Sequence, residues 1–280
     1  MRETDVPLPD GGVLHVYDTG DGGADQLAVL WHHGTPNTGS PPRPLFPASE
    51  RLGIRWISYD RPGYGGSTPR PGRDVASAAG YAALTADALG VDRFAVMGHS
   101  GGGPHALACA ALLGDRVVAA VAGASLAPYG APGLDYFAGM AASGALSLST
   151  AARGRAEKER LQESGTPYDP EFAAADLAAL HGPWSWFEEV VGAGVASGHA
   201  PAIDDDLAYV APWGFEPAQV RVPVLLLHGG LDRIVPVAHA RWLAARLPAA
   251  ELRVGEEDGH ISVLTAGDEA LSWIRERAGG

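Results

Sequence analysis

The stretch that decides the fold is Phe94-Ala-Val-Met-Gly-His-Ser-Gly-Gly-Gly103, in which an apolar run meets a serine flanked by glycines. The apolar run predicts a buried strand, and the Ala- and Leu-rich residues 101–113 predict a helix. A serine on so sharp a strand-to-helix turn exposes its hydroxyl above the sheet, and its neighbours must lack bulky side chains. The helix also directs its N-terminal N–H groups and its dipole at this point, where they favour negative charge. We therefore predict that Ser100 is a nucleophile.

Short apolar runs and helical stretches alternate on both sides of this turn, which is typical of β-α-β units. We expect an α/β fold with a mostly parallel, doubly wound sheet. Predicted buried strands are residues 27–32, 54–59, 94–98, 117–122 and 222–227, with a last strand near 252–254. Predicted helices are residues 75–89 with Asp74 as N-cap, 101–113, 238–247 and 266–277. Residues 14–17 follow an Asp-Gly-Gly turn signal and predict an antiparallel edge strand of a hairpin.

Between residues 128 and 217 no comparable strand pattern occurs, and Pro, Gly and charged helical pieces fill the segment. We expect a core domain made of residues 1–127 and 218–280, with a helical cap inserted at 128–217. Aromatic side chains gather in this cap, and two interpretations of them are open. They either form an apolar wall that binds substrate or only join the cap to the core. The predicted substrate-binding residues are Trp184, Trp186 and Trp213, accompanied by Phe187 and Phe215.

The segment Gly98-His99-Ser100-Gly101-Gly102, between a strand and a helix, resembles the nucleophile elbow of the α/β-hydrolase superfamily. Three further motifs share this resemblance. His33-Gly34-Thr35-Pro36 resembles the oxyanion loop of the family, and Asp60-Arg61-Pro62-Gly63-Tyr64-Gly65-Gly66-Ser67 resembles its Asp-x-Pro-Gly-x-Gly-x-Ser turn. His228-Gly229-Gly230-Leu231-Asp232 and Asp258-Gly259-His260 occur where the family has its acid and its base. The resemblance covers nearly the whole chain outside the cap and implies a serine hydrolase.

A serine hydroxyl is a poor nucleophile at neutral pH, so it needs an imidazole to take its proton and a carboxylate to orient that imidazole. Among the ten histidines, His260 is the best candidate because it follows Gly259 on the loop after the last predicted strand. Asp232 lies just after the predicted strand 222–227, at the sheet edge where open α/β sheets build their sites. The order Ser100, Asp232, His260 is the one expected for the superfamily. The acidic run at 204–206 lies in the cap, and a charge run is usually a solvated face.

The oxyanion that forms on attack needs two N–H donors. The resemblance implies that these donors are the backbone N–H groups of Thr35 and Gly101. His32 and His33 raise the alternative of a metal site, but adjacent strand residues point to opposite faces and cannot readily share one ion. By the same resemblance, His33 is expected to brace the oxyanion loop.

Residues 101–106 also fit the G-x-G-x-x-A pattern of dinucleotide-binding proteins. That interpretation requires an acidic residue about twenty positions further on, and residues 117–124 contain none. A phosphate-binding P-loop is excluded because the only lysine, Lys158, follows Glu157 and not a glycine. We therefore predict no cofactor and no metal.

The balance of 20 basic against 33 acidic side chains gives a net charge of −13, which argues against binding to nucleic acid or to an anionic membrane. Cys109 is the only cysteine, so no intramolecular disulfide and no thiolate zinc site can form. No signal peptide is evident, and the longest apolar stretch, residues 117–127, is too short to span a bilayer. We expect a soluble, cytoplasmic monomer or homodimer whose partner is a small-molecule substrate.

Together these expectations describe an enzyme that cleaves a carboxylic ester, or a related thioester or lactone, through an acyl-enzyme on Ser100. The substrate is expected to be small and mainly apolar. Ser100 differs from the Asp nucleophile of haloalkane dehalogenases and epoxide hydrolases, and Gly101 differs from the Trp usual in proline iminopeptidases. The same three residues also support a cofactor-free lyase, a C–C hydrolase or an acyltransferase, and a non-catalytic ligand sensor remains a further alternative.

Overall fold

The computed structural model describes residues 1–20 and 26–279. These residues form an eight-stranded sheet with the order β1-β2-β4-β3-β5-β6-β7-β8. The strands are β1 (Arg2–Pro7), β2 (Val13–Asp18), β3 (Leu27–His32), β4 (Ile54–Tyr59), β5 (Phe94–His99), β6 (Val117–Gly123), β7 (Val224–Gly229) and β8 (Ala250–Gly255). Strands β3 to β8 pair in parallel, whereas β1 and β2 pair antiparallel at one side. The predicted fold class is confirmed.

Three local predictions differ from the structure. The strand predicted at 14–17 is not the edge of the sheet, because β1 pairs on its outer side over six residues. The sequence does not predict β1, because only Val6 of this strand is buried, so it lacks an apolar run. Strand β7 starts at Val224, after Pro223, which has no N–H to give to a ladder. Helix α2 (Ser77–Ala88) begins later than predicted, and Ala76 is its N-cap. Asp74 instead accepts the Ser77 N–H at 2.8 Å, which caps the turn before the helix.

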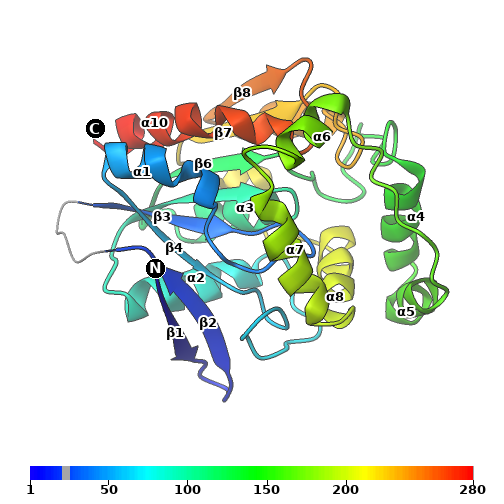
Figure 1. The fold of residues 1–280 in the computed structure, drawn as a ribbon, viewed down its shortest axis with the longest axis horizontal. Coiled ribbons are helices and arrows are strands. Elements are labelled where there is room, and N and C mark those ends of the chain that lie inside the picture. Colours follow the sequence, from blue (N-terminus) through cyan, green and yellow to red (C-terminus); the bar gives the residue numbers. More distant parts are fainter. Residues whose placement is uncertain (21–25, 280) are drawn as a thin grey trace.

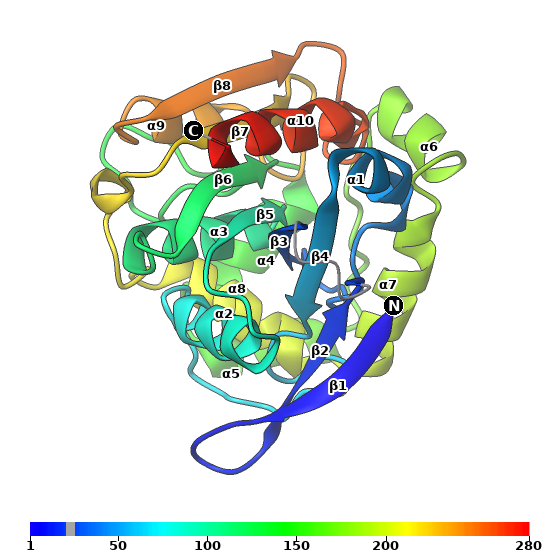
Figure 2. The ribbon, with the colours of Figure 1, turned by 90° about the vertical axis from the view of Figure 1, so that its left-hand side faces the viewer.

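Helices cover both faces of the sheet, as Figure 2 shows. Helices α2, α3 (Gly102–Leu112) and α9 (Ala238–Ala244) cover one face, and α1 (Phe46–Leu52) and α10 (Gly267–Ala278) cover the other. The 3-10 helices are η1 (Arg43–Leu45), η2 (Pro217–Gln219) and η3 (Ser262–Ala266). None of the helices in the described part of the chain combines the length and the apolar character needed to cross a bilayer.

Two hydrophobic cores lie on the two faces of the sheet. In β3 the side chains alternate: Leu30 enters the core beneath α2 and α3, whereas Val29 and Trp31 enter the core beneath α1 and α10. All three are at most 1% exposed. A strand whose side chains are buried on both faces has no polar alternation, which explains why the continuous apolar runs of the sequence predicted these strands so closely.

Five α-helices lie between β6 and β7 in the chain, and Figure 1 shows them in its right-hand half. They are α4 (Ala142–Ala151), α5 (Arg155–Glu163), α6 (Ala174–Leu180), α7 (Trp186–Ala196) and α8 (Ala200–Val210). Residues 124–223, all of which the structure describes, contain no strand. We refer to these five helices and the segments that join them as the cap; the domain boundaries at 127/128 and 217/218 stay a prediction.

The turn between β5 and α3 brings backbone segments very close together. A Cβ atom added at Gly98 would lie 2.1 Å from the Gly102 carbonyl oxygen, which is backbone and cannot rotate away. Ser100 follows with a φ of 56°, in the left-handed region that non-glycine residues rarely adopt. The sharp turn that the sequence predicted is therefore possible only because residue 98 has no side chain.

We predict that Gly98→Ala lowers the free energy of unfolding by about 2–3 kcal/mol, because the new methyl group collides with backbone. Gly80→Ala is the matched control: it lies inside α2 with nothing within 4 Å of the added Cβ. There the same change should raise the free energy of unfolding by about 0.5–1 kcal/mol through helix propensity. Urea denaturation of both variants measures this, and equal stability of Gly98→Ala and wild type would contradict it.

Candidate active site

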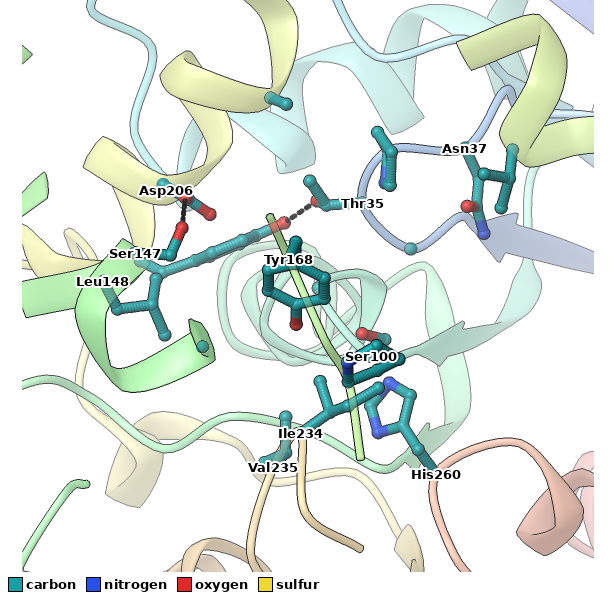
Figure 3. A pocket seen from close by; sticks show the side chains of 18 of the residues that line it. Thr35, Asn37, Ser100, Ser147, Leu148, Tyr168, Asp206, Ile234, Val235 and His260 are labelled. Carbon is teal, nitrogen blue, oxygen red and sulfur yellow. Dashed lines mark hydrogen bonds between the residues drawn. The ribbon is translucent and has the colours of Figure 1, made fainter. Parts of the chain in front are cut away.

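A pocket of about 540 Å³ lies between the cap and the carboxyl ends of the parallel strands. Its lining includes Ser100, His260, Thr35 and Gly101, which follow β5, β8, β3 and β5 in the chain. Carboxyl ends of parallel strands meet at the same edge of a sheet, so these loops converge although they are far apart in sequence. Figure 3 shows the His260 ring next to Ser100 at one side of this pocket.

The backbone N–H of Ser100 donates to the Gly123 carbonyl at 2.8 Å, which fixes the turn against β6. The Ser100 hydroxyl makes no hydrogen bond to any other residue among 1–20 and 26–279. Its side chain is only partly buried and lines the pocket. The hydroxyl is thus free to meet a ligand.

The imidazole of His260 is oriented by Asp232. Its Nδ1 donates to Asp232 Oδ2 at 2.8 Å, which leaves the unprotonated Nε2 as an acceptor. The other carboxylate oxygen, Oδ1, accepts the N–H groups of Ile234 at 2.9 Å and Val235 at 2.8 Å. Burial raises the pKa of Asp232, but His260, His228 and these hydrogen bonds outweigh it and hold the pKa below its usual value. Asp232 is therefore a carboxylate that can stabilise a protonated His260.

A second histidine packs behind the first. The rings of His99 and His260 lie 4.9 Å apart, and His99 Nε2 donates to the His260 carbonyl at 2.8 Å. Burial, aided by the nearby His260, lowers the pKa of His99 to about 3, so this ring is neutral at neutral pH. Its role is to support the loop that carries His260.

The same loop is held from the cap by Asp176 of α6. The Asp176 carboxylate, 1% exposed, accepts the backbone N–H groups of His260 at 3.0 Å, Ile261 at 2.8 Å and Ser262 at 2.8 Å. Nothing local in the sequence indicates this contact, because Asp176 precedes the loop by more than eighty residues. A carboxylate of the cap thus fixes the backbone beside the candidate base.

The loop after β3 is held by a buried arginine. Arg61 donates through its guanidinium to the carbonyl oxygens of His33 and, at 3.0 Å, Gly34. In a trans peptide the C=O and the next N–H point in opposite directions, so the Thr35 N–H points away from Arg61. Neither Thr35 N nor Gly101 N donates a hydrogen bond to another residue in the described part of the chain. Both N–H groups are therefore available to a ligand in the pocket.

Asp205 of α8 neutralises this arginine. Its carboxylate lies 2.6 Å from Arg61 and 2.7 Å from Arg73, and it is fully buried. Burial raises the pKa of Asp205, but the two guanidinium groups outweigh it and hold the pKa well below the usual value. The interpretation of residues 204–206 as a solvated face is wrong, because cations of the core and of α5 bind these carboxylates.

Tyr209, also on α8, occupies the space above the turn. A Cβ atom at Gly101 would lie 2.1 Å from the Tyr209 hydroxyl oxygen. That hydroxyl lies 2.8 Å from Thr35 Oγ1, which itself donates to Asp205 at 2.6 Å. The absence of a side chain at residue 101 thus has a physical cause: a cap tyrosine fills the place that a side chain would take.

The structure does not bring the three predicted tryptophans to the pocket. Trp184 and Trp186 pack in the core beneath α1 and α10, and Trp213 packs in the opposite core. Their exposed fractions are 2%, 6% and 2%, so their aromatic area is used in core packing. Phe187 does line the pocket, and aliphatic side chains form a further part of its wall. These include Leu126, Met140, Leu148, Val191, Ile203, Ile234, Val235 and Ile261.

His32 and His33 have separate environments. His33 Nε2 accepts the Arg61 backbone N–H at 2.9 Å and its Nδ1 contacts the Gly34 carbonyl at 2.8 Å, which agrees with a bracing role. His32 Nε2 lies 3.4 Å from the sulfur of Cys109. Among residues 1–20 and 26–279, no three His, Cys, Asp or Glu side chains are arranged to hold a metal ion.

We predict that Asp176→Asn lowers the free energy of unfolding by about 3 kcal/mol, because an amide cannot replace a carboxylate that accepts three buried N–H groups. Asp135→Asn, an exposed change of the same kind, is the control and should leave stability within about 0.5 kcal/mol of wild type. Thermal and urea unfolding measure both. Equal effects of the two substitutions would contradict the anchoring role of Asp176.

We also predict that stability falls as the pH drops from about 6.5 towards 4. In the folded chain burial lowers the pKa of six imidazoles, to about 3 for His32 and His99 and to about 4 for His239. The other three are His33, His105 and His228. The unfolded chain takes up these protons near pH 6.5 and the folded chain does not. Below that pH the free energy of unfolding therefore falls by about 1.4 kcal/mol per pH unit for each ring.

One imidazole acts with the opposite sign. The pKa of His15 is raised by Asp5, Asp60 and Glu3 against the effect of burial, so its contribution is present at low pH and is lost as the pH rises. Because six imidazoles destabilise the folded chain in acid and only His15 stabilises it, the free energy of unfolding should fall as the pH drops. Urea unfolding at several pH values between about 7 and 5 measures this, and a constant or rising stability in acid would contradict it.

Comparison with known proteins agrees with the fold described above. Residues 28–266 match the family described as alpha/beta hydrolase fold. The chain is 28% identical over 231 residues to the dihydrolipoyllysine-residue acetyltransferase component of the acetoin cleaving system of Cupriavidus necator, covering 80% of this chain and 56% of that protein. It is 40% identical over 57 residues to a pimeloyl-[acyl-carrier protein] methyl ester esterase of Aromatoleum aromaticum, covering 20% and 23%.

The matched region thus spans about half of the acetyltransferase component and about a quarter of the methyl ester esterase. Among solved structures, a bromoperoxidase from Bacillus anthracis superposes with a TM-score of 0.75 at 20% identity, covering 98% of this chain and all of that one. The family match supports a hydrolase role. Since the family match extends over most of the sheet, the elbow and the loops around the pocket, the chain belongs to the α/β-hydrolase fold family.

Proposed function

We propose that the protein hydrolyses a carboxylic ester, or a related thioester or lactone, through an acyl-enzyme on Ser100. The observation that carries this proposal is the hydrogen bond of 2.8 Å from His260 Nδ1 to Asp232, in a pocket that also holds the free Ser100 hydroxyl. An imidazole fixed in this tautomer presents an unprotonated Nε2 to the pocket. It can therefore take the serine proton.

The reaction follows from these groups. Ser100 Oγ attacks the ester carbonyl while its proton passes to His260 Nε2, and Asp232 stabilises the imidazolium. The carbonyl oxygen becomes an oxyanion, which the unengaged N–H groups of Thr35 and Gly101 stabilise by about 3 kcal/mol each. His260 then gives its proton to the leaving alcohol as the C–O bond breaks, and the acyl group stays on Ser100.

Water completes the cycle. His260 takes a proton from a water molecule, whose oxygen attacks the acyl carbon, and returns that proton to Ser100 as the acid is released. The N-terminus of α3 directs its dipole towards the same position and adds to the stabilisation of the negative charge. The aliphatic side chains in the pocket wall, among them Ile234 and Val235, favour an acyl or alcohol group that is mainly apolar beside the reacting carbonyl.

The test is hydrolysis of p-nitrophenyl esters of increasing acyl length by wild type, Ser100→Ala and His260→Ala. Both substitutions should lower kcat by about 10⁴-fold or more, since each removes a group that acts in the transition state. Ser272→Ala and His181→Ala, which lie outside the pocket, are the matched controls and should retain activity.

A fluorophosphonate probe should label wild type and fail to label Ser100→Ala, because it reacts with an activated serine hydroxyl. Ester hydrolysis that survives in Ser100→Ala would contradict the proposal. Labelling without turnover of any ester would instead favour the sensor or lyase alternatives.

A further inference from the structure

Three cap helices place a lysine, an aspartate and a serine together in the wall of the pocket. Lys158 of α5 lies 2.6 Å from the Asp206 carboxylate of α8. Ser147 of α4 donates to the same carboxylate oxygen, Oδ2, at 2.9 Å, and the Lys158 ammonium donates to the Ser147 hydroxyl. All three line the pocket that holds Ser100. We refer to Lys158, Asp206 and Ser147 as the cap cluster.

Stability alone does not account for this arrangement. Lys158 is the only lysine of the chain, yet it is 5% exposed, whereas lysines are almost always exposed. A buried ion pair is often no more stable than apolar side chains of the same volume. A few polar groups converging in an otherwise apolar pocket, by contrast, orient and select a ligand. The cap cluster has the position and the surroundings of such a recognition site.

The cap cluster faces the reacting groups across the pocket. Figure 3 shows Asp206 and Ser147 on one side and Ser100 and His260 on the other, with Tyr168 between them. Leu148, Ile234 and Val235 contribute apolar surface to the same pocket. A molecule that reaches both sides therefore has a carbonyl at Ser100, an apolar middle and a polar end at the cap cluster.

The charges of the cap cluster define the chemistry of that polar end. Lys158 and Asp206 neutralise one another, so the cap cluster has no net charge with which to favour an incoming carboxylate or ammonium, and either ion would also meet a like charge. The ion pair with Lys158 and the hydrogen bond from Ser147 both involve Asp206 Oδ2. Within the described part of the chain, Oδ1 accepts no hydrogen bond. A neutral group that both donates and accepts satisfies Oδ1 and the lysine together.

We propose that the cap cluster is a subsite for an uncharged hydroxyl or amide group at the end of the ligand remote from Ser100. This inference rests on the proposed function only in assigning the reacting carbonyl to Ser100. It refines the expectation of a mainly apolar substrate, because one end of the molecule is then polar. The corresponding substrate class is an ester with an apolar chain that ends in a hydroxyl or an amide.

The test uses binding of straight-chain methyl ketones, which lack an ester bond and cannot be hydrolysed. Ketones of equal length ending in methyl, hydroxymethyl, carboxylate or ammonium are titrated into wild type by calorimetry. The hydroxyl-ended ketone should bind about tenfold more tightly than the methyl-ended one, because it hydrogen bonds to charged groups. Equal affinities, no binding of any ketone, or tighter binding of the carboxylate or ammonium would overturn the proposal.

Paired substitutions locate the effect. Lys158→Met with Asp206→Leu removes both charges together, so neither is left unpaired, and this double variant should lose the tenfold preference. Arg155→Met with Asp204→Leu is the matched control, because it removes another ion pair between α5 and α8 that does not line the pocket. The control should keep the preference, and a preference that survives in the first variant would overturn the proposal.

The ketone measurement is independent of catalysis. Absence of ester hydrolysis would refute the proposed function and leave the ketone affinities to decide the subsite. Equal ketone affinities in an active esterase would refute the subsite and leave the esterase standing.

Discussion

The buried ion pair between Arg61 and Asp205 is the interaction on which the rest of the site depends. Arg61 holds the carbonyl groups of the loop after β3, and that contact turns the Thr35 N–H away from the arginine. The arginine can be buried there only because Asp205 compensates its charge from the cap. Removing one partner of a buried ion pair typically costs about 3–5 kcal/mol, so the loop and α8 are energetically one unit.

Much of the fold was predictable from the sequence because its signals are local. The apolar runs of β3 and β4 are buried on both faces, and Gly98 is required by the backbone of Gly102, only four residues further on. Asp232 and His260 were likewise indicated by their place just after predicted strands, and the structure joins them by a hydrogen bond. β1 was missed because its strand is mostly exposed and therefore has no apolar run.

The cap was much less predictable, because its important contacts join residues that are far apart in sequence. Asp205 lies 144 residues from Arg61, and Asp176 lies 84 residues from His260. An acidic run looks the same in sequence whether water solvates it or a buried arginine neutralises it. Composition was equally ambiguous for Trp184 and Trp213, since a tryptophan that fills a core and one that lines a pocket leave the same trace in a sequence. Only the packing of the helices separates these cases.

The carboxylate of Asp176 has a consequence for how this fold can be modified. Two cap helices, α6 and α8, each give a carboxylate to a loop that follows a strand of the sheet, whereas α4 and α5 pack chiefly on each other and on α8. A chimera that exchanges α4 and α5 would vary the far wall of the pocket and keep these bridges. A chimera that exchanges the whole cap must supply both carboxylates anew, or it leaves Arg61 and Arg73 without a carboxylate and three peptide N–H groups without an acceptor.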